Sequence, residues 1–136
     1  MSRIATCQCR GFQAIVTGEP AYIGMCHCTE CQRRSGVPLT CNAYFPSDQV
    51  RLEGDRKVYT RDGAEGRQLH NSFCPTCGAT VCWTADLLPG HIGIAVGCFN
   101  DPDFPAPHAS TWEQSMAKWV TPPDGTARFT QGRMKT

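Results

Sequence analysis

Short apolar runs separated by glycines and prolines dominate the pattern of hydrophobic and polar positions along this chain. Runs of this length, with β-branched and aromatic residues and with turn residues at both ends, are typical of β-strands. No internal repeat or low-complexity segment interrupts the pattern. It predicts strands at residues 12–16, 39–45, 50–52, 57–60, 67–73, 80–83, 91–96 and 109–112.

Only one stretch, residues 29–35, has helical character. Thr29 is a candidate N-cap, and Gly36 is the residue expected to end the helix. The expected fold class is therefore mostly β, with antiparallel sheets and one short helix. The chain of 136 residues fits a single domain, 1–136, and is long enough to bury a core.

Charge and hydropathy argue against two classes of partner. The formal net charge is +1 and no block of like charges is present, so we expect no nucleic acid to bind. No apolar run approaches the ~20 residues needed to cross a bilayer, so we expect no membrane partner. Residues 1–7 lack a signal-peptide hydrophobic stretch, which predicts a cytoplasmic protein.

The chain contains ten cysteines, which in a reducing compartment are typical of metal sites rather than disulfides. Cys74 and Cys77, followed by Gly78, form a CxxCG motif that can wrap one side of a zinc ion. A structural zinc site needs four ligands. Cys7 and Cys9 are expected to supply the other two, because residues i and i+2 of a strand share a face. We call these four cysteines the knuckle cluster.

Three further cysteines, Cys26, Cys28 and Cys31, lie within six residues, and we call them the helix cluster. Three protein ligands with a vacant fourth position are typical of a catalytic zinc. Glu30 or His27 could fill that position and close the site. His27 alternates away from its neighbours in an extended stretch, so it is the poorer ligand. The sequence thus predicts two zinc ions per chain.

The charge of the helix cluster indicates its chemistry. Three thiolates on Zn²⁺ leave a net charge of −1, which makes ionising a bound water harder than at a three-histidine site. Zinc accepts soft sulfur well and removes the proton of a bound thiol, so a thiol cosubstrate is favoured over simple hydrolysis. Of the two arginines that follow the cluster, we expect one on a solvated face. Arg33 is the candidate contact for a substrate carboxylate.

The remaining cysteines and the tryptophans are expected to pack into the core. Free cysteine in an apolar run behaves as a small hydrophobic residue, which applies to Cys41, Cys82 and Cys98. Large aromatic side chains are more often buried than exposed in a chain of this size, which applies to Trp83, Trp112 and Trp119.

The combined motifs resemble the glutathione-dependent formaldehyde-activating enzyme family, which also includes the centromere protein V-like proteins. The likeness runs over nearly the whole chain and rests on Cys7-x-Cys9, Cys26-His27-Cys28-x-x-Cys31-Gln32-Arg33-x-Ser35-Gly36, Phe73-Cys74-x-x-Cys77-Gly78, Asn100-Asp101-Pro102, Pro107-His108 and Lys118-Trp119. One departure is Arg10, which stands directly after Cys9 where the family usually has glycine.

The resemblance implies a β-tent fold of antiparallel sheets held by a structural zinc. It implies that the structural zinc is bound by Cys7, Cys9, Cys74 and Cys77. It implies that the catalytic zinc is bound by Cys26, Cys28 and Cys31. The family's named activity joins glutathione and formaldehyde to give S-hydroxymethylglutathione, a carbon–sulfur lyase reaction of aldehyde detoxification.

We therefore expect a zinc-dependent carbon–sulfur lyase whose partners are a small-molecule thiol, with glutathione as one candidate, and an aldehyde such as formaldehyde. One alternative is a non-catalytic zinc-binding protein-interaction module. Another is a zinc deaminase, because Cys28, Glu30 and the later CxxC motif echo the signature of those enzymes. The deaminase hypothesis leaves four cysteines unused, and no proline precedes Cys74.

Overall fold

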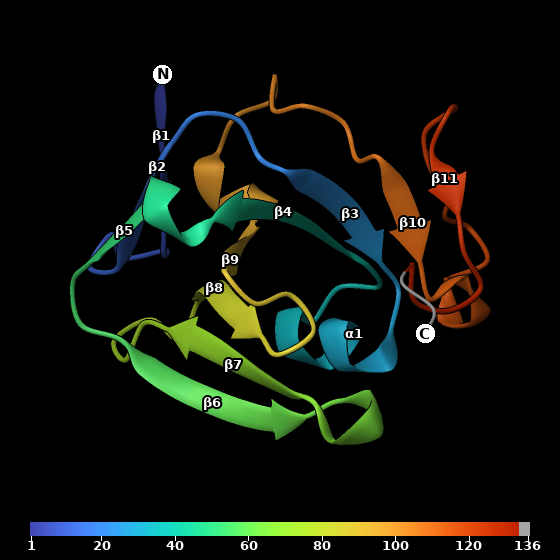
Figure 1. Ribbon diagram of the computed structural model, residues 1–136, viewed down its shortest axis with the longest axis horizontal. Helices are drawn as coiled ribbons and strands as arrows, with labels where there is room; N and C mark the ends of the chain where they lie inside the picture. Colours follow the sequence, from blue (N-terminus) through green and yellow to red (C-terminus); the bar gives the residue numbers. More distant parts are fainter. Residues whose placement is uncertain (134–136) are drawn as a thin grey trace.

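The computed structural model describes residues 1–133, which form two β-sheets and one α-helix (Figure 1). The smaller sheet has three strands in the order β1-β2-β5, and the larger has eight in the order β11-β10-β3-β4-β9-β8-β7-β6. The mostly-β fold class with one short helix is confirmed. The strands are β1 Ser2–Thr6, β2 Gln13–Thr17, β3 Tyr22–Cys26, β4 Thr40–Pro46, β5 Val50–Glu53, β6 Lys57–Asp62, β7 Gln68–Phe73, β8 Thr80–Ala85, β9 His91–Ala95, β10 Ala109–Thr111 and β11 Ala127–Arg128.

Every region predicted to be a strand contains one, but the sequence pattern missed β1, β3 and β11. Strand β11 has only two residues, whereas β1 and β3 have five each, as β2 and β9 do, and are recognised through the strands they pair with. The pairing is not purely antiparallel, because β10 runs parallel to both β3 and β11. Four short 3₁₀ turns complete the described chain: η1 Ser47–Gln49, η2 Ala64–Gly66, η3 Val96–Phe99 and η4 Glu113–Ser115. No helix among residues 1–133 is both long and apolar enough to cross a bilayer.

The hydrophobic core lies where the two sheets pack on each other. Ala14 and Val16 of β2 are buried in alternation, and they share one cluster with Phe45 and Ile94 of the larger sheet. Full burial of an aliphatic or aromatic side chain contributes about 1.5–3 kcal/mol relative to exposure. The core therefore occupies one face of β4, and its other face is free to line a site.

The helix α1, Thr29–Ser35, covers the predicted residues, but its N-cap lies one residue earlier than expected. The N-cap is Cys28, whose Sγ accepts a hydrogen bond from the backbone N–H of Cys31 at 3.3 Å, so the prediction of Thr29 was wrong. Gly36 ends the helix in the left-handed region at φ 75°, as predicted. A helix of seven residues with no buried side chain is not stable alone, so tertiary contacts must hold it.

Gly54, in the segment that joins β5 to β6, packs directly on the turn that carries Cys7 and Cys9. It adopts φ 94°, and a Cβ atom there would lie 1.8 Å from the carbonyl oxygen of Gly11. Gly11 itself contacts the Sγ of Cys9, since a Cβ at Gly11 would lie 3.4 Å from that atom. The absence of a side chain at Gly54 thus sets the position of this cysteine turn.

We predict that Gly54→Ala lowers the free energy of unfolding by about 3 kcal/mol or more, because backbone must move in addition to the strain of a positive φ. Gly125→Ala is the matched control, since Gly125 has φ 84° but open space around its Cβ position. The control should lose only about 1–2 kcal/mol. Denaturant unfolding of both metal-loaded variants measures the difference, and equal losses would contradict the prediction.

Candidate metal centres

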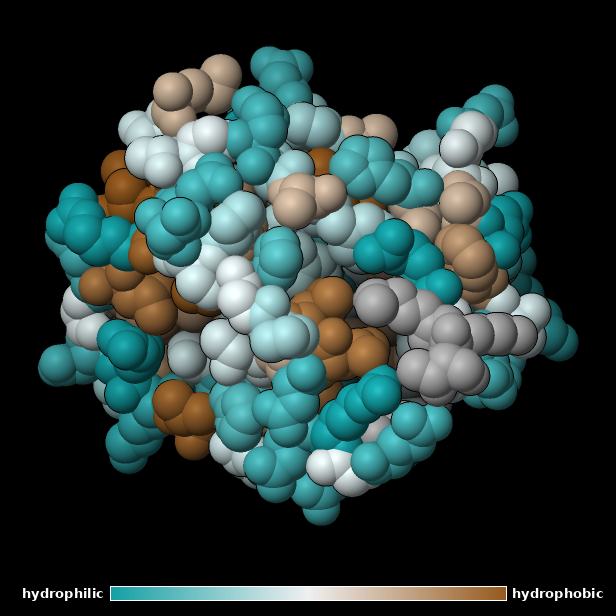
Figure 2. Space-filling model, in the orientation of Figure 1, coloured by the Kyte–Doolittle hydropathy of each residue, from teal (hydrophilic) through white to brown (hydrophobic). Residues whose placement is uncertain are grey.

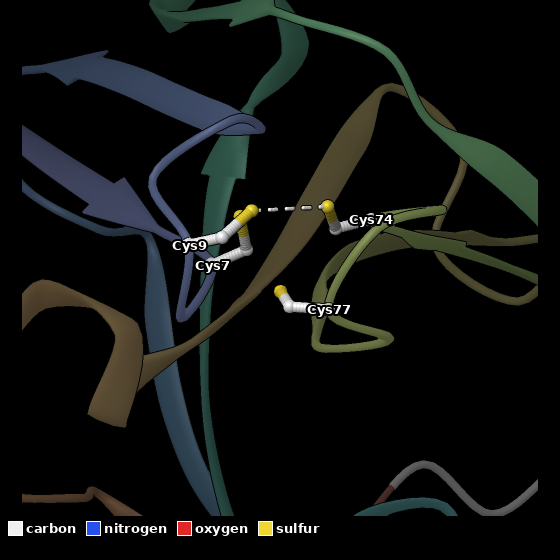
Figure 3. Close-up of side chains that lie close together, drawn as sticks. All are labelled: Cys7, Cys9, Cys74 and Cys77. Atoms are coloured by element: carbon white, nitrogen blue, oxygen red, sulfur yellow. Dashed lines mark hydrogen bonds between the residues drawn. The ribbon is translucent and has the colours of Figure 1, made fainter.

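The knuckle cluster brings together two turns from different sheets (Figure 3). Cys7 and Cys9 lie in the turn after β1 of the three-stranded sheet. Cys74 and Cys77 lie in the turn that joins β7 and β8 of the eight-stranded sheet. All four Sγ atoms are within 4.8 Å of one another, and Cys9 lies 3.6 Å from both Cys7 and Cys74. The cluster therefore joins the two sheets.

Cys7 and Cys9 were expected to share one face of a strand, but they lie in a turn. Strand β1 ends at Thr6, and the backbone N–H of Arg10 donates to the carbonyl of Cys7 at 3.1 Å. The two sulfurs meet because the chain turns, and they do not share a strand face. Arg10 adopts φ 69°, and Gly78, directly after Cys77, adopts φ 80°. Both turns thus need a left-handed residue after the second cysteine, which explains the glycine usual at this position in the family.

Backbone N–H groups donate to several of the knuckle sulfurs. The N–H of Phe12 donates to Cys7 Sγ at 3.2 Å, and that of Thr76 donates to Cys74 Sγ at 3.3 Å. The N–H groups of Ala79 and Cys9 lower the pKa of Cys77 to about 6, which favours the thiolate that binds a metal. The N–H of Gly11 lowers the pKa of Cys9, but contacts with Cys74 and Cys7 outweigh it and raise that pKa to about 11.

The donor set of the knuckle cluster fits zinc. Zinc takes four thiolates in a tetrahedron with Zn–S of about 2.3 Å, which requires S–S separations of about 3.8 Å. The measured separations of 3.6 Å are close to that value. Cys7 and Cys74 are also buried, which suits a closed structural site.

The helix cluster is built at the junction of β3 and α1. Cys26 is the last residue of β3, Cys28 caps the helix, and Cys31 lies in its first turn. Their Sγ atoms are within 4.8 Å of one another, and no fourth histidine, cysteine or carboxylate of the described chain joins them. This donor set fits a zinc ion with one position left for another ligand. Glu30 instead forms an ion pair with Arg33 at 2.8 Å.

His27 points away from the helix cluster and anchors the segment. Its ring is fully buried, and Nε2 lies 2.8 Å from the hydroxyl of Ser110. Its carbonyl accepts hydrogen bonds from Ser115 Oγ at 2.6 Å and from Gln32 Nε2 at 2.9 Å. Burial lowers the pKa of His27, which favours the neutral ring. Sequence reasoning missed these anchors because the two serines are 83 and 88 residues away along the chain.

The helix cluster opens into a cavity of about 850 Å³, which all three of its cysteines line. This volume is within the range of about 300–1,000 Å³ that is usual for small-molecule sites. In Figure 1, α1 lies between the β3–β4 part and the β6–β7 part of the bent sheet, and both parts contribute to the walls. Aromatic side chains contribute to the cavity walls, namely those of Tyr22, Tyr44, Trp83 and Trp112. The knuckle cluster does not line this cavity.

The two arginines of α1 have different surroundings. Arg33, the predicted substrate contact, has a side chain that is 73% exposed, pairs with Glu30 and does not line the cavity. Arg34 does line it, with its guanidinium carbon 4.3 Å from the ring centroid of Trp83. Successive helical residues point about 100° apart, so the two side chains reach different surroundings. Of the two arginines, the structure places Arg34 at the cavity, whereas a substrate contact of Arg33 stays a prediction.

The thiols of the helix cluster differ in pKa. Hydrogen bonds from Cys26 and Cys28 lower the pKa of Cys31, and the charge of Arg34 adds to this effect. The same contacts raise the pKa of Cys26. The thiolate form is thus favoured at Cys31, which is also the thiol that the charge of Arg34 affects.

The lone cysteines pack as apolar residues. Cys82 belongs to the buried core, and Cys41 and Cys98 pack against it. Burial raises the pKa of all three thiols, that of Cys82 to about 11, so they stay neutral. Trp83 is buried as expected, whereas Trp119 is 74% exposed, so a core position for it was wrong.

The fold and the two centres define a class: small β-sheet proteins with one closed and one open cysteine cluster, both compatible with zinc. The chain belongs to the glutathione-dependent formaldehyde-activating enzyme family, whose model matches residues 2–115. This match confirms the resemblance carried by the cysteine motifs.

Further comparisons concern the fold alone. A search of curated proteins finds no match. A crystal structure of a Rhodobacter sphaeroides protein from a structural genomics programme is similar, with a TM-score of 0.56 and 21% identity. The likeness covers 96% of this chain and 100% of that chain. At this identity it supports a shared architecture and says nothing about activity.

We predict that the chain binds two zinc ions and that Cys77→Ser and Cys28→Ser each lose one of them, with different effects on stability. Cys77→Ser should lower the Tm strongly, because its cluster joins the sheets. Cys28→Ser should leave the Tm nearly unchanged, since serine also caps a helix. Native mass spectrometry and thermal unfolding measure both effects. Cys98→Ala is the control that keeps both ions, and loss of both ions from Cys28→Ser would refute two independent centres.

Proposed function

We propose that this protein is a zinc-dependent carbon–sulfur lyase that joins a thiol to an aldehyde such as formaldehyde. The observation that carries the proposal is the helix cluster, where three cysteine side chains line a cavity and no fourth protein ligand of the described chain closes the site. In this proposal the chain holds two zinc ions. The ion in the knuckle cluster is structural, and the ion held by Cys26, Cys28 and Cys31 is catalytic.

A zinc ion held by the three cysteines would favour the thiolate form of an incoming thiol at neutral pH. The thiolate sulfur forms a bond to the aldehyde carbon, and the π electrons of the carbonyl move to its oxygen. That oxygen then takes the proton that the thiol released, so thiol and formaldehyde give an S-hydroxymethyl thioether. The step needs no oxidant or reductant.

Residues of the cavity would bind and orient the thiol. Arg34 beside Trp83 and Arg133, whose guanidinium carbon lies 3.9 Å from the ring centroid of Tyr22, place two cations against the aromatic wall. Such cations suit a thiol that carries carboxylates, because carboxylates pair with arginine in charge-assisted hydrogen bonds. Glutathione has this chemistry and is named in the family's description. We therefore propose glutathione or a similar anionic thiol as the partner.

The two alternative functions have less support. A deaminase would need Cys28, Cys74 and Cys77 around one metal, but these residues lie in separate clusters. A protein-interaction module would use exposed aromatic residues, and Trp119 is one. However, hydrophobic residues on the face in Figure 2 occur in small separate groups and do not form one broad patch. An open cluster in a cavity favours small-molecule chemistry.

We predict that the zinc-loaded protein accelerates S-hydroxymethylglutathione formation from glutathione and ¹³C-formaldehyde, as measured by NMR exchange spectroscopy. Cys28→Ser should lose at least about 100-fold of the acceleration, because the ligand set is broken. Cys98→Ala should keep it. Rates equal to the protein-free reaction in the zinc-loaded wild type would refute the proposed activity.

We also predict that Arg34→Gln weakens glutathione binding by about 10-fold or more, the value of a charge-assisted hydrogen bond. Binding of uncharged 2-mercaptoethanol should change little. Arg33→Gln is the matched control, since Arg33 points to solvent one residue away. Titration calorimetry of the zinc-loaded proteins tests this, and a larger effect of Arg33→Gln than of Arg34→Gln would contradict the assignment.

A further inference from the structure

The side chain of Tyr22 lies along its own strand, β3, toward the helix cluster. It is half-buried and lines the cavity. A Cβ atom at Gly24 would lie 2.6 Å from the hydroxyl oxygen of Tyr22, so the phenol end of the ring occupies the space above Gly24. Gly24 and Cys26 follow Tyr22 on the same face of the strand. Two residues along a strand span about 6.6–6.8 Å, which places the hydroxyl about one such step from Cys26.

The two tyrosines of the cavity wall direct their hydroxyls to different places. Tyr44 is paired with Tyr22 across β3 and β4, but its oxygen accepts a hydrogen bond from Nε1 of Trp83 at 3.2 Å. The Tyr44 hydroxyl is therefore held against a residue of β8. Tyr22 is the tyrosine whose hydroxyl lies above the strand that ends in the helix cluster.

The hydroxyl of Tyr22 is suited to donate a hydrogen bond. The guanidinium carbon of Arg133 lies 3.9 Å from the centroid of the Tyr22 ring, and arginine has only hydrogen-bond donors, so it cannot accept the hydroxyl proton. Burial raises the pKa of Tyr22, and the charge of Arg133 opposes this effect. The side chain thus offers a neutral O–H group to the cavity.

The proposed reaction creates negative charge close to this hydroxyl. A thiol sulfur at the helix cluster bonds to the aldehyde carbon, and the oxygen that becomes negative is only two bonds from that sulfur. Hydrogen-bond donors placed where such charge develops are usually the largest single contribution to catalysis. A donor one strand step from Cys26 is therefore in the region where the aldehyde oxygen must lie.

We propose that Tyr22 is a catalytic residue whose hydroxyl donates a hydrogen bond to the aldehyde oxygen and then passes its proton to that oxygen. This inference rests on the proposed function, because it assigns a residue to the aldehyde in that same reaction. As the sulfur–carbon bond forms, the π electrons of the carbonyl move to its oxygen, which takes the Tyr22 proton. The Tyr22 oxygen regains the proton that the thiol released, so no proton is consumed.

Tyr22→Phe tests the proposal because it removes only the hydroxyl and keeps the ring beside Arg133 and Tyr44. In the full chain loaded with zinc, the acceleration of S-hydroxymethylglutathione formation at saturating glutathione should fall by about 100-fold, the usual effect of one proton or hydrogen-bond donor. NMR exchange spectroscopy measures this rate. Glutathione binding, measured by titration calorimetry, should change by less than about threefold, because the hydroxyl acts on the aldehyde and not on the thiol.

Gly24→Ala tests the position of the hydroxyl while leaving it present. The three atoms nearest to the new Cβ all belong to the phenol end of Tyr22, so the side chain moves and the backbone stays. The acceleration should fall by about 10-fold or more, because misplacing a catalytic group by about 1 Å is costly. The double variant Tyr22→Phe/Gly24→Ala should lose no more than Tyr22→Phe alone, since both substitutions act through one group.

Tyr59→Phe is the matched control for the loss of a tyrosine hydroxyl. Tyr59 is 60% exposed and does not line the cavity, so this variant should keep the wild-type rate. Zinc content and circular dichroism verify that each variant is loaded and folded.

The outcomes separate this inference from the proposed function. If Tyr22→Phe keeps the wild-type acceleration, or loses it only together with glutathione binding, the catalytic role of Tyr22 is refuted and the thiol chemistry stands. Losses that multiply in the double variant would also refute it. If the zinc-loaded wild type gives no acceleration, the proposed function fails, and this inference fails with it.

Discussion

The convergence of four cysteine sulfurs from two sheets is the contact on which the rest of the structure depends. One pair comes from the turn after β1, and the other from the turn between β7 and β8. The three-stranded sheet also shares the core with the eight-stranded sheet. A metal at this point would fix the β7–β8 hairpin, and β8 carries Trp83 into the cavity wall. The geometry of the cavity beside the helix cluster is thus linked to the knuckle cluster.

The two clusters differ because their surroundings differ. The knuckle cluster has four sulfurs, backbone N–H donors and two buried members, which together suit a closed site. The helix cluster has three sulfurs at the edge of a cavity, so a metal there keeps a free position. Cys28 serves both as a helix cap and as a candidate ligand, while the buried His27 is tied to β10 and η4. Local folding and metal geometry therefore support each other.

Most of the strands and the helix could be predicted because their signals are local. The alternation of residues in β4 is an example, and so is Gly36 at the helix end. The misses have a common cause. Strands β1, β3 and β11 are defined by the strands they pair with. The cap moved to Cys28 because a sulfur can accept the N–H hydrogen bond that an oxygen usually takes.

The cysteine motifs were enough to predict which cysteines form each candidate centre, because cysteines two or three residues apart can hold one metal and the two remaining pairs complete a set of four. The sequence also determined the family, through the same motifs. The tertiary structure was needed to show that Arg34 and not Arg33 lines the cavity, and that residues of β4, β7 and β8 line it together with the helix cluster. The physical reason is that helix orientation and strand pairing bring together residues that are far apart in the sequence, and no local pattern records those contacts.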